Sequence, residues 1–124
     1  MTENGILKLM TNATADEALE EGVYDALVFG PFLIVNGKPL QIHGDPWGKA
    51  PRVTIAQRKD GLLMFLVVDG ENYINGATLQ DLVDVLTRYG AYNAANLDGG
   101  QSSSLTVNGK LYNTPPPAAK RQGG

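Results

Sequence analysis

The sequence has no cysteine, a single histidine and no hydrophobic run approaching the roughly 18 residues that a membrane-spanning helix requires. Without cysteine, disulfides and thiolate catalysis are excluded, and the redox compartment stays open. Ten Lys and Arg residues against 13 Asp and Glu residues give a net charge of −3. This balance excludes the basic surface that typifies nucleic-acid binding. The N-terminus lacks a basic segment followed by an apolar core, so we expect no signal peptide.

What remains is the composition of an ordinary folded domain. Hydrophobic residues make up 43% of the chain and charged residues 19%, values typical of globular proteins. A length of 124 residues corresponds to one domain or part of one. We expect residues 1–113 to form this domain. Residues 114–124 contain three consecutive prolines and end in two glycines, which predicts an extended or disordered tail.

Two segments have the signals of helices. Thr14 and Glu17 have the spacing of a capping box, which predicts a short helix at residues 15–21. Thr78 and Asp81 have the same spacing at the start of a longer helix, residues 78–89. Apolar residues recur there at positions i, i+3, i+4 and i+7, and predict one buried stripe formed by Leu79, Leu82, Val83 and Leu86.

The other regular segments have the pattern of strands and hairpins. Two Asn-Gly pairs, at 36–37 and 108–109, predict tight hairpin turns. Residues 52–58 alternate in polarity, whereas the apolar segments 26–29 and 62–68 predict buried strands, the latter central and covered on both faces. We therefore predict an α+β fold in which one main amphipathic helix packs on a mixed, largely antiparallel sheet.

The segment 94–104 concentrates the polar chemistry. Asp98 follows a predicted strand and precedes two glycines, which allow the backbone to approach a ligand closely. The turn's N–H groups, with Ser102 and Ser103 beside them, can form a nest for an anion or a sugar hydroxyl. The structural alternative is an Asx turn in which serines cap a tight connection.

Three other positions allow both a functional and a structural interpretation. His43 and Asp45 could form an acid/base or metal-binding pair, although geometry must decide. Trp47 could stack on a sugar ring or anchor its loop. Asp69 ends the apolar segment 62–68, where it could be functional or could initiate a turn.

The chain resembles the phosphodiester glycosidases in several motifs. The sequence Asn96–Leu97–Asp98–Gly99–Gly100, followed by Ser102 and Ser103, is similar to the family's N-L-D-G-G-G-S-S signature. Four further segments are similar in the same order, namely Gly30–Pro31 with 33–38, 50–55, Asp69–Gly70 and 76–79. The chain departs from the family pattern at Glu71, where arginine is usual, and at Gln101, where a third glycine is usual. The family's N-G-G-[FY]-F segment has no counterpart before Gly30, so the chain resembles the C-terminal two-thirds of such a domain.

This resemblance implies hydrolysis of a sugar-1-phosphodiester, since the family includes an enzyme that removes N-acetylglucosamine from a phosphodiester. Glycosidases commonly use two carboxyl groups, and the resemblance implies Asp98 and Asp69. It implies Arg52 as a clamp for the phosphate, because a guanidinium can hold phosphate oxygens through two hydrogen bonds. The remaining implied substrate-binding residues are Asn96, which orients the loop, and Gly99, Gly100, Ser102 and Ser103.

Two other classes of protein fit the sequence. A carbohydrate-binding or cell-surface module with impaired catalysis would bind a sugar or sugar phosphate without turnover. A structural fragment would associate with another copy through exposed strand edges.

No cofactor is implied. Asp69, Asp98 and Asn96 could together bind a hard cation such as calcium, but their spacing does not require one. We expect no nucleic-acid partner and no membrane span. The resemblance suggests an extracytoplasmic or cell-surface location.

Overall fold

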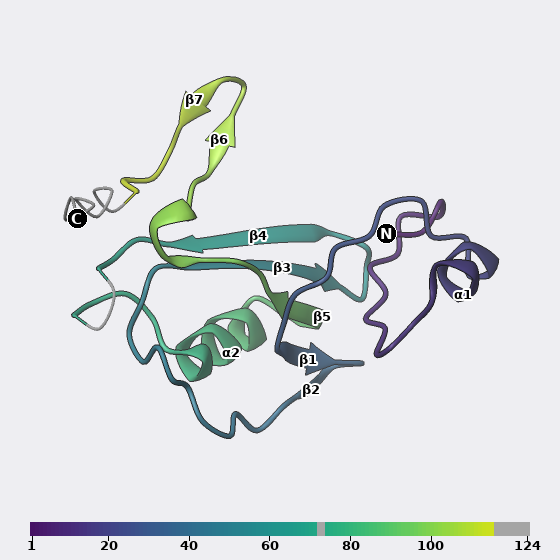
Figure 1. Cartoon of the computed structure of the whole chain (residues 1–124), viewed down its shortest axis with the longest axis horizontal. Helices are drawn as coiled ribbons and strands as arrows, with labels where there is room; N and C mark the ends of the chain where they lie inside the picture. The colour runs from purple at the N-terminus through teal and green to yellow at the C-terminus, as the bar shows by residue number, and fades with distance from the viewer. Residues whose placement is uncertain (72–73, 116–124) are drawn as a thin grey trace, which may run out of the picture.

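A computed structural model describes residues 1–71 and 74–115 of the chain. Five antiparallel strands form one sheet in the order β2–β1–β5–β3–β4 (Figure 1). The strands are β1 (Phe32–Val35), β2 (Lys38–Pro39), β3 (Arg52–Arg58), β4 (Leu63–Val68) and β5 (Ala91–Asn96). Helix α2 (Leu79–Arg88) packs against β1 and β5. The predicted α+β fold is therefore confirmed.

The core forms between α2 and the sheet. Leu79, Leu82, Val83 and Leu86 are all buried, so the predicted apolar stripe is confirmed. They pack with small and branched residues of the sheet, among them Ile34, Ala56 and Ala94. Thr78 and Asp81 form both hydrogen bonds of the predicted capping box, at 2.8 and 3.1 Å between backbone nitrogen and side-chain oxygen. The helix is thus held by local capping and by burial of its apolar face.

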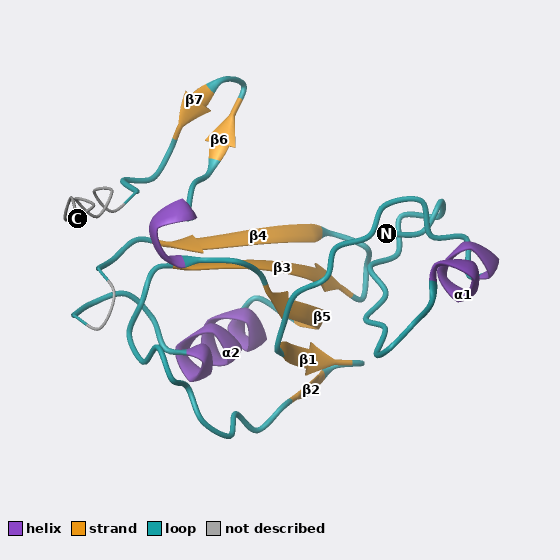
Figure 2. Cartoon of the chain, in the orientation of Figure 1, coloured by secondary structure: helices purple, strands orange, loops and turns teal. Residues whose placement is uncertain are grey.

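Smaller elements lie at the two ends of the chain (Figure 2). Helix α1 (Ala15–Glu20) has the predicted capping box. Gln57 of β3 joins the N-terminal segment to the sheet: its Oε1 accepts from the Leu7 N–H at 2.8 Å and its Nε2 donates to the Gly5 carbonyl at 2.6 Å. At the other end, a 3₁₀ turn η1 (Gly100–Ser102) leads to the predicted hairpin of β6 (Thr106–Val107) and β7 (Lys110–Leu111). The tail predicted from residue 114 lies, from 116 onward, outside the described residues.

Two strand predictions were wrong. Residues 26–29 form no strand, and the Val28 side chain is 99% exposed. The apolar segment 62–68 does contain β4, but β4 is an edge strand paired only with β3. Met64, Leu66 and Val68 pack against the core, whereas Phe65 points to the other face and is 58% exposed. The apolar residues on both faces of β4 predicted that both faces are buried. In the described chain, only the face toward the core is covered.

Strand directions bring three strand ends together. β4 and β5 each pair antiparallel with β3, so they run in the same direction on either side of it. In this register Arg52 at the start of β3 pairs with Val68, and Thr54 pairs with Asn96. Asp69 and Asp98, which follow β4 and β5, therefore lie at the same end of the strands as Arg52.

Two glycines allow backbone segments to pack tightly beside these strand ends. Gly76 has a φ of +113°, and a Cβ placed on it would lie 2.3 Å from the Ala50 carbonyl oxygen. A Cβ on Gly99 would lie 2.7 Å from the carbonyl oxygen of Pro51. Both distances are too short for a side chain, so segments 76–77 and 99–100 can lie against residues 50–51 only because these positions are glycine.

Candidate functional site

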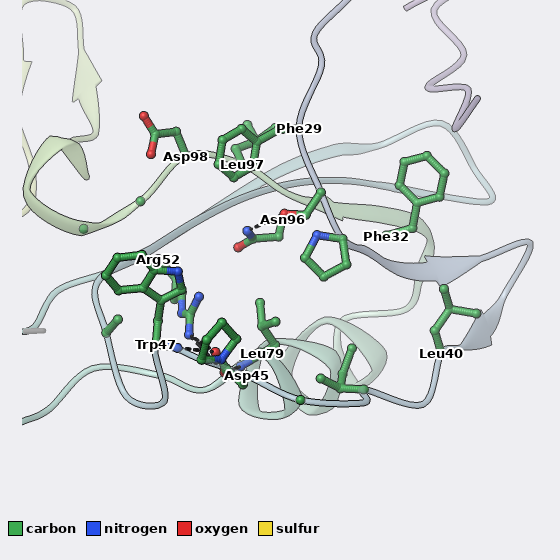
Figure 3. Close-up of a pocket in the computed structure, with 18 of the residues that line it drawn as sticks. Phe29, Phe32, Leu40, Asp45, Trp47, Arg52, Leu79, Asn96, Leu97 and Asp98 are labelled. Atoms are coloured by element: carbon green, nitrogen blue, oxygen red, sulfur yellow. Dashed lines mark hydrogen bonds and ion pairs between the residues drawn. The ribbon is translucent and has the colours of Figure 1, made fainter. Parts of the chain in front are cut away.

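A groove of about 810 Å³ opens beside these strand ends. Its wall is formed by the loop after β2, the segment before β1, and the ends of β3 and β5. We call it the Trp47 groove; its lining includes Phe29, Phe32, Leu40, Trp47, Asn96 and Asp98 (Figure 3). Aromatic and aliphatic side chains supply most of the lining, and the polar side chains in it are those of Gln41, His43, Asp45, Arg52, Asn96 and Asp98. Such a surface fits a small organic ligand held by a few directed hydrogen bonds.

Asp45 and Arg52 form an ion pair in the wall of the groove. Nη2 of Arg52 lies 2.9 and 3.0 Å from the two carboxylate oxygens of Asp45, and both side chains are largely buried. Nη2 also donates to the Gly48 carbonyl at 2.7 Å, and Nε donates to the Ala77 carbonyl at 3.0 Å. Arg52 therefore joins the loop, the start of α2 and the sheet, and Nη1 is the guanidinium nitrogen left for a ligand.

Asp45 also caps helix α2. Its Oδ2 accepts from the backbone N–H of Leu79, the first residue of the helix, at 2.8 Å. Burial alone would raise the pKa of Asp45, but the hydrogen bonds from Leu79 and Arg52, together with the charge of Arg52, hold that pKa below its ordinary value. Asp45 is therefore an ionised structural carboxylate. Its partners are Arg52, Leu79 and the Trp47 N–H, so it does not form the pair with His43 that the sequence allowed.

Trp47 lies on the rim of the groove. Its backbone N–H donates to Oδ1 of Asp45 at 3.3 Å, which fixes the loop, while its side chain is 53% exposed. Figure 3 shows the indole on the same side of the groove as Asp45 and opposite Leu97 and Asp98. An aromatic side chain so placed offers a face on which the apolar side of a sugar ring can stack.

The loop after β5 forms the opposite rim. Leu97 donates its N–H to the Val53 carbonyl at 2.8 Å and Gly100 donates to the Pro51 carbonyl at 3.0 Å, so the loop is fixed to β3 and the residue before it. Between these two anchors, Asp98 is exposed. In the part of the chain that the structure describes, the Asp98 carboxylate has no hydrogen-bond or ion-pair partner. It is the one candidate carboxylate on the rim that remains available for chemistry.

Three of the predicted site residues lie outside the lining of the groove. Asp69 accepts from the Asn113 side chain at 2.8 Å and from the Thr114 N–H at 2.9 Å, which fixes the segment after the β6–β7 hairpin. Ser102 donates its hydroxyl to the Gly99 carbonyl at 2.8 Å, and Ser103 is fully buried. The structure thus brings Arg52, Asn96, Asp98, Gly99 and Gly100 to the groove, and leaves Asp69, Ser102 and Ser103 outside its lining.

Two features of the site had no clear signal in the sequence. The Asp45–Arg52 pair joins a loop to a strand, and nothing in a separation of seven residues selects this partner over His43. Phe29, Phe32 and Leu40 line the groove, although the sequence predicted their segments to be strands or an arm of a hairpin.

Among the described residues no group of three or more His, Cys, Asp or Glu side chains could hold a metal ion. None of the helices in those same segments has the length and apolar character needed to cross a bilayer.

The comparisons with known proteins decide the family. The sequence profile of the phosphodiester glycosidase family matches residues 1–123. The chain belongs to this family. It is 34% identical over 118 residues to the SPbeta prophage-derived protein YomE of Bacillus subtilis, covering 90% of this chain and 18% of YomE. It is 34% identical over 64 residues to bovine N-acetylglucosamine-1-phosphodiester alpha-N-acetylglucosaminidase, covering 52% of this chain and 12% of that enzyme.

Two solved structures of similar fold support the assignment. The catalytic domain of the zebrafish N-acetylglucosamine-1-phosphodiester alpha-N-acetylglucosaminidase superposes with a TM-score of 0.52 at 33% identity, covering 54% of this chain and 22% of that one. A hypothetical protein from Synechocystis superposes with a TM-score of 0.66 at 28% identity, covering 79% of this chain and 19% of that one. This phosphodiester glycosidase chain spans less than a fifth of the length of the curated relatives it matches.

Proposed function

We propose that the chain hydrolyses a sugar-1-phosphodiester at the glycosidic carbon, with a sugar of the N-acetylglucosamine type. The observation that supports this most is the exposed, unpartnered Asp98 on the rim of a largely apolar groove, in a chain of the phosphodiester glycosidase family. Related enzymes that the chain resembles are named for cleaving an N-acetylglucosamine-1-phosphodiester. A carboxylate beside such a groove supplies one of the two carboxyl groups that glycosidases commonly use.

The proposed step uses Asp98 as general base. The Asp98 carboxylate takes a proton from a water molecule, and the water oxygen attacks the anomeric carbon. The bond between this carbon and the phosphate oxygen breaks, and the phosphate monoester leaves with the bonding electron pair. Arg52 Nη1 stabilises the departing anion, while Gly99 and Gly100 allow the backbone to approach the substrate. We assign Asp69 a positioning role, because both of its oxygens accept hydrogen bonds from the segment after β7.

Hydrolysis of UDP-N-acetylglucosamine in heavy-oxygen-labelled water tests this proposal. Cleavage at the glycosidic carbon puts the label in free N-acetylglucosamine and releases UDP. Cleavage at phosphorus puts the label in a phosphate product and would identify a different reaction. Saturable binding without any product would instead favour the carbohydrate-binding module, and neither binding nor product would contradict a sugar-phosphate site.

A second candidate function is association with another copy of the chain. β4 pairs only with β3, so its other edge is open in the described chain, and Phe65 on it is 58% exposed. An open, apolar edge strand can pair with the same strand of a second molecule. We expect the sedimentation coefficient to rise with protein concentration, and Phe65→Lys to suppress this rise. A concentration-independent monomer in the wild type would contradict the idea.

A further inference from the structure

His43 presents an imidazole that the fold does not use to the Trp47 groove. It lies in the loop after β2, is exposed, and lines the groove together with Asp45 two residues further on. In the described segments its imidazole has no hydrogen-bond or ion-pair partner. It is the only histidine of the chain, and the proposed reaction assigns it no role. The described lining thus includes an accessible group that can become positively charged.

The charges of the groove leave a phosphodiester without a balancing cation. The titratable or charged groups in the described lining are those of His43, Asp45, Arg52 and Asp98. Asp45 and Arg52 neutralise each other in their ion pair, so Asp98 leaves a net negative charge when His43 is neutral. A phosphodiester is itself an anion, and like charges repel. Binding of this substrate therefore favours a positive charge on His43.

The two other cations of this region are already used by the fold. The Arg52 side chain is only 7% exposed, so it offers a ligand one edge of the guanidinium at most. Lys49 belongs to the same loop as His43 but lies outside the groove lining. Hydrogen bonds from Thr78, together with the charge of Lys49, lower the pKa of Asp81 in the first turn of α2. The charge of Lys49 therefore acts on the start of this helix.

The loop that carries His43 is also on the side where the phosphate of the proposed substrate lies. A water molecule activated by a general base attacks the anomeric carbon from the face opposite the leaving group. Figure 3 shows Asp45 and Trp47 across the groove from Asp98. His43 precedes Asp45 by two residues, so their Cα atoms lie at most about 7 Å apart. With Asp98 on one side of the sugar, the phosphate faces the loop after β2.

We propose that the protonated imidazole of His43 binds the phosphate of the substrate, and so makes the groove select sugar phosphodiesters over uncharged glycosides. This inference rests on the proposed function, because it takes the ligand to be a sugar phosphodiester attacked from the Asp98 side. An imidazolium has two N–H donors and a full charge, so its hydrogen bond to a phosphate oxygen is stronger than one to a neutral hydroxyl. Histidine side chains gain their proton between about pH 5 and 8, so the preference is strongest in acid and is lost as pH rises.

Calorimetric titration with two esters of one sugar phosphonate tests the inference without requiring turnover. The monomethyl ester of the C-glycosyl phosphonate of N-acetylglucosamine is an anion across this pH range, whereas the dimethyl ester is uncharged. In the wild type we expect the monomethyl ester to bind about tenfold more tightly at about pH 5.5 than at about pH 8, because a hydrogen bond to a charged group is lost. The dimethyl ester should bind equally at both pH values.

Two substitutions separate the charge of His43 from its shape. His43→Gln keeps a hydrogen-bond donor without a charge, so it should bind the monomethyl ester at both pH values as weakly as the wild type does at the higher one. His43→Lys is charged at both pH values and should bind this ester tightly at both. Lys49→Gln, the matched control, removes a charge of the same loop outside the groove lining and should leave the tenfold ratio unchanged. A merely structural role would weaken both esters by the same factor in His43→Gln, which would overturn the inference.

The imidazole itself reports on the contact. Binding and protonation are linked reciprocally, so a tenfold gain in affinity on protonation raises the midpoint of the imidazole titration by about one pH unit in the presence of saturating ligand. Because the chain has a single histidine, one set of ring-proton signals follows this titration by NMR, with and without the monomethyl ester. An unchanged midpoint in the wild type would overturn the inference even if neither variant folded.

The result can be separated from the outcome of the hydrolysis experiment. Tighter binding of the monomethyl ester in acid, without hydrolysis, would remove the proposed function and support the role of His43 in a binding module. Hydrolysis combined with pH-independent binding of this ester would support the proposed function and overturn the role of His43. Failure of the monomethyl ester to bind at either pH would overturn it as well.

Discussion

Asp98→Asn is expected to reduce the turnover of a sugar-1-phosphodiester at least about 100-fold, because a positioned general base contributes on the order of 10²–10⁴ to the rate. The substitution keeps the size of the side chain and removes its ability to take a proton. The Asp98 carboxylate has no partner in the described chain, so the free energy of unfolding should not change. Steady-state rates and thermal unfolding of the same preparations measure the two effects.

Asp16→Asn is the matched control for this prediction. Asp16 is an exposed carboxylate in the first turn of α1, outside the groove lining. Its substitution alters the net charge by the same amount and should leave turnover unchanged. Equal turnover of Asp98→Asn and the wild type would show that Asp98 is not catalytic. Equal losses in both variants would attribute the effect to net charge.

Asp45→Ala is expected to destabilise the fold by about 3 kcal/mol or more, because removing one partner of a buried ion pair leaves an uncompensated charge. It also removes the acceptor for the first N–H of α2. Urea unfolding near neutral pH measures the change. The control is Asp60→Ala in the exposed Arg58–Asp60 pair, which should cost no more than about 1 kcal/mol. Similar losses in both variants would show that burial of the Asp45–Arg52 pair adds little.

The same pair predicts a pH dependence of stability. The pKa of Asp45 is lower in the folded chain than its ordinary value of 3.8, so the unfolded chain takes up the proton first as pH falls. The stabilisation from ionised Asp45 is therefore complete above pH 3.8 and is lost as pH falls through the folded pKa. The difference in unfolding free energy between wild type and Asp45→Ala should shrink over this acidic range. A constant difference would contradict the ionised role of Asp45.

The position of β4 shows what a sequence pattern cannot predict. Its six apolar residues correctly predicted a strand. Whether a strand is central or at an edge depends on which other strands pair with it, and these come from distant parts of the chain. The segment 26–29 failed for the same reason, since apolar residues there find no strand to pair with in the described fold. Hydrophobicity predicts a need for burial, but partners decide whether burial occurs.

The candidate site divides in the same way. By itself the sequence determined the α2 stripe, both capping boxes, both Asn-Gly hairpins and the Asp98–Gly99–Gly100 motif, because these depend on neighbours within a few residues. Only the tertiary structure decided that Asp45 pairs with Arg52, that Asp69 binds the segment after β7, and that the Asn96 side-chain oxygen is buried without a donor among the described residues. All three features depend on segments that strand pairing brings together. The free energy that selects them comes from packing and burial across the whole sheet.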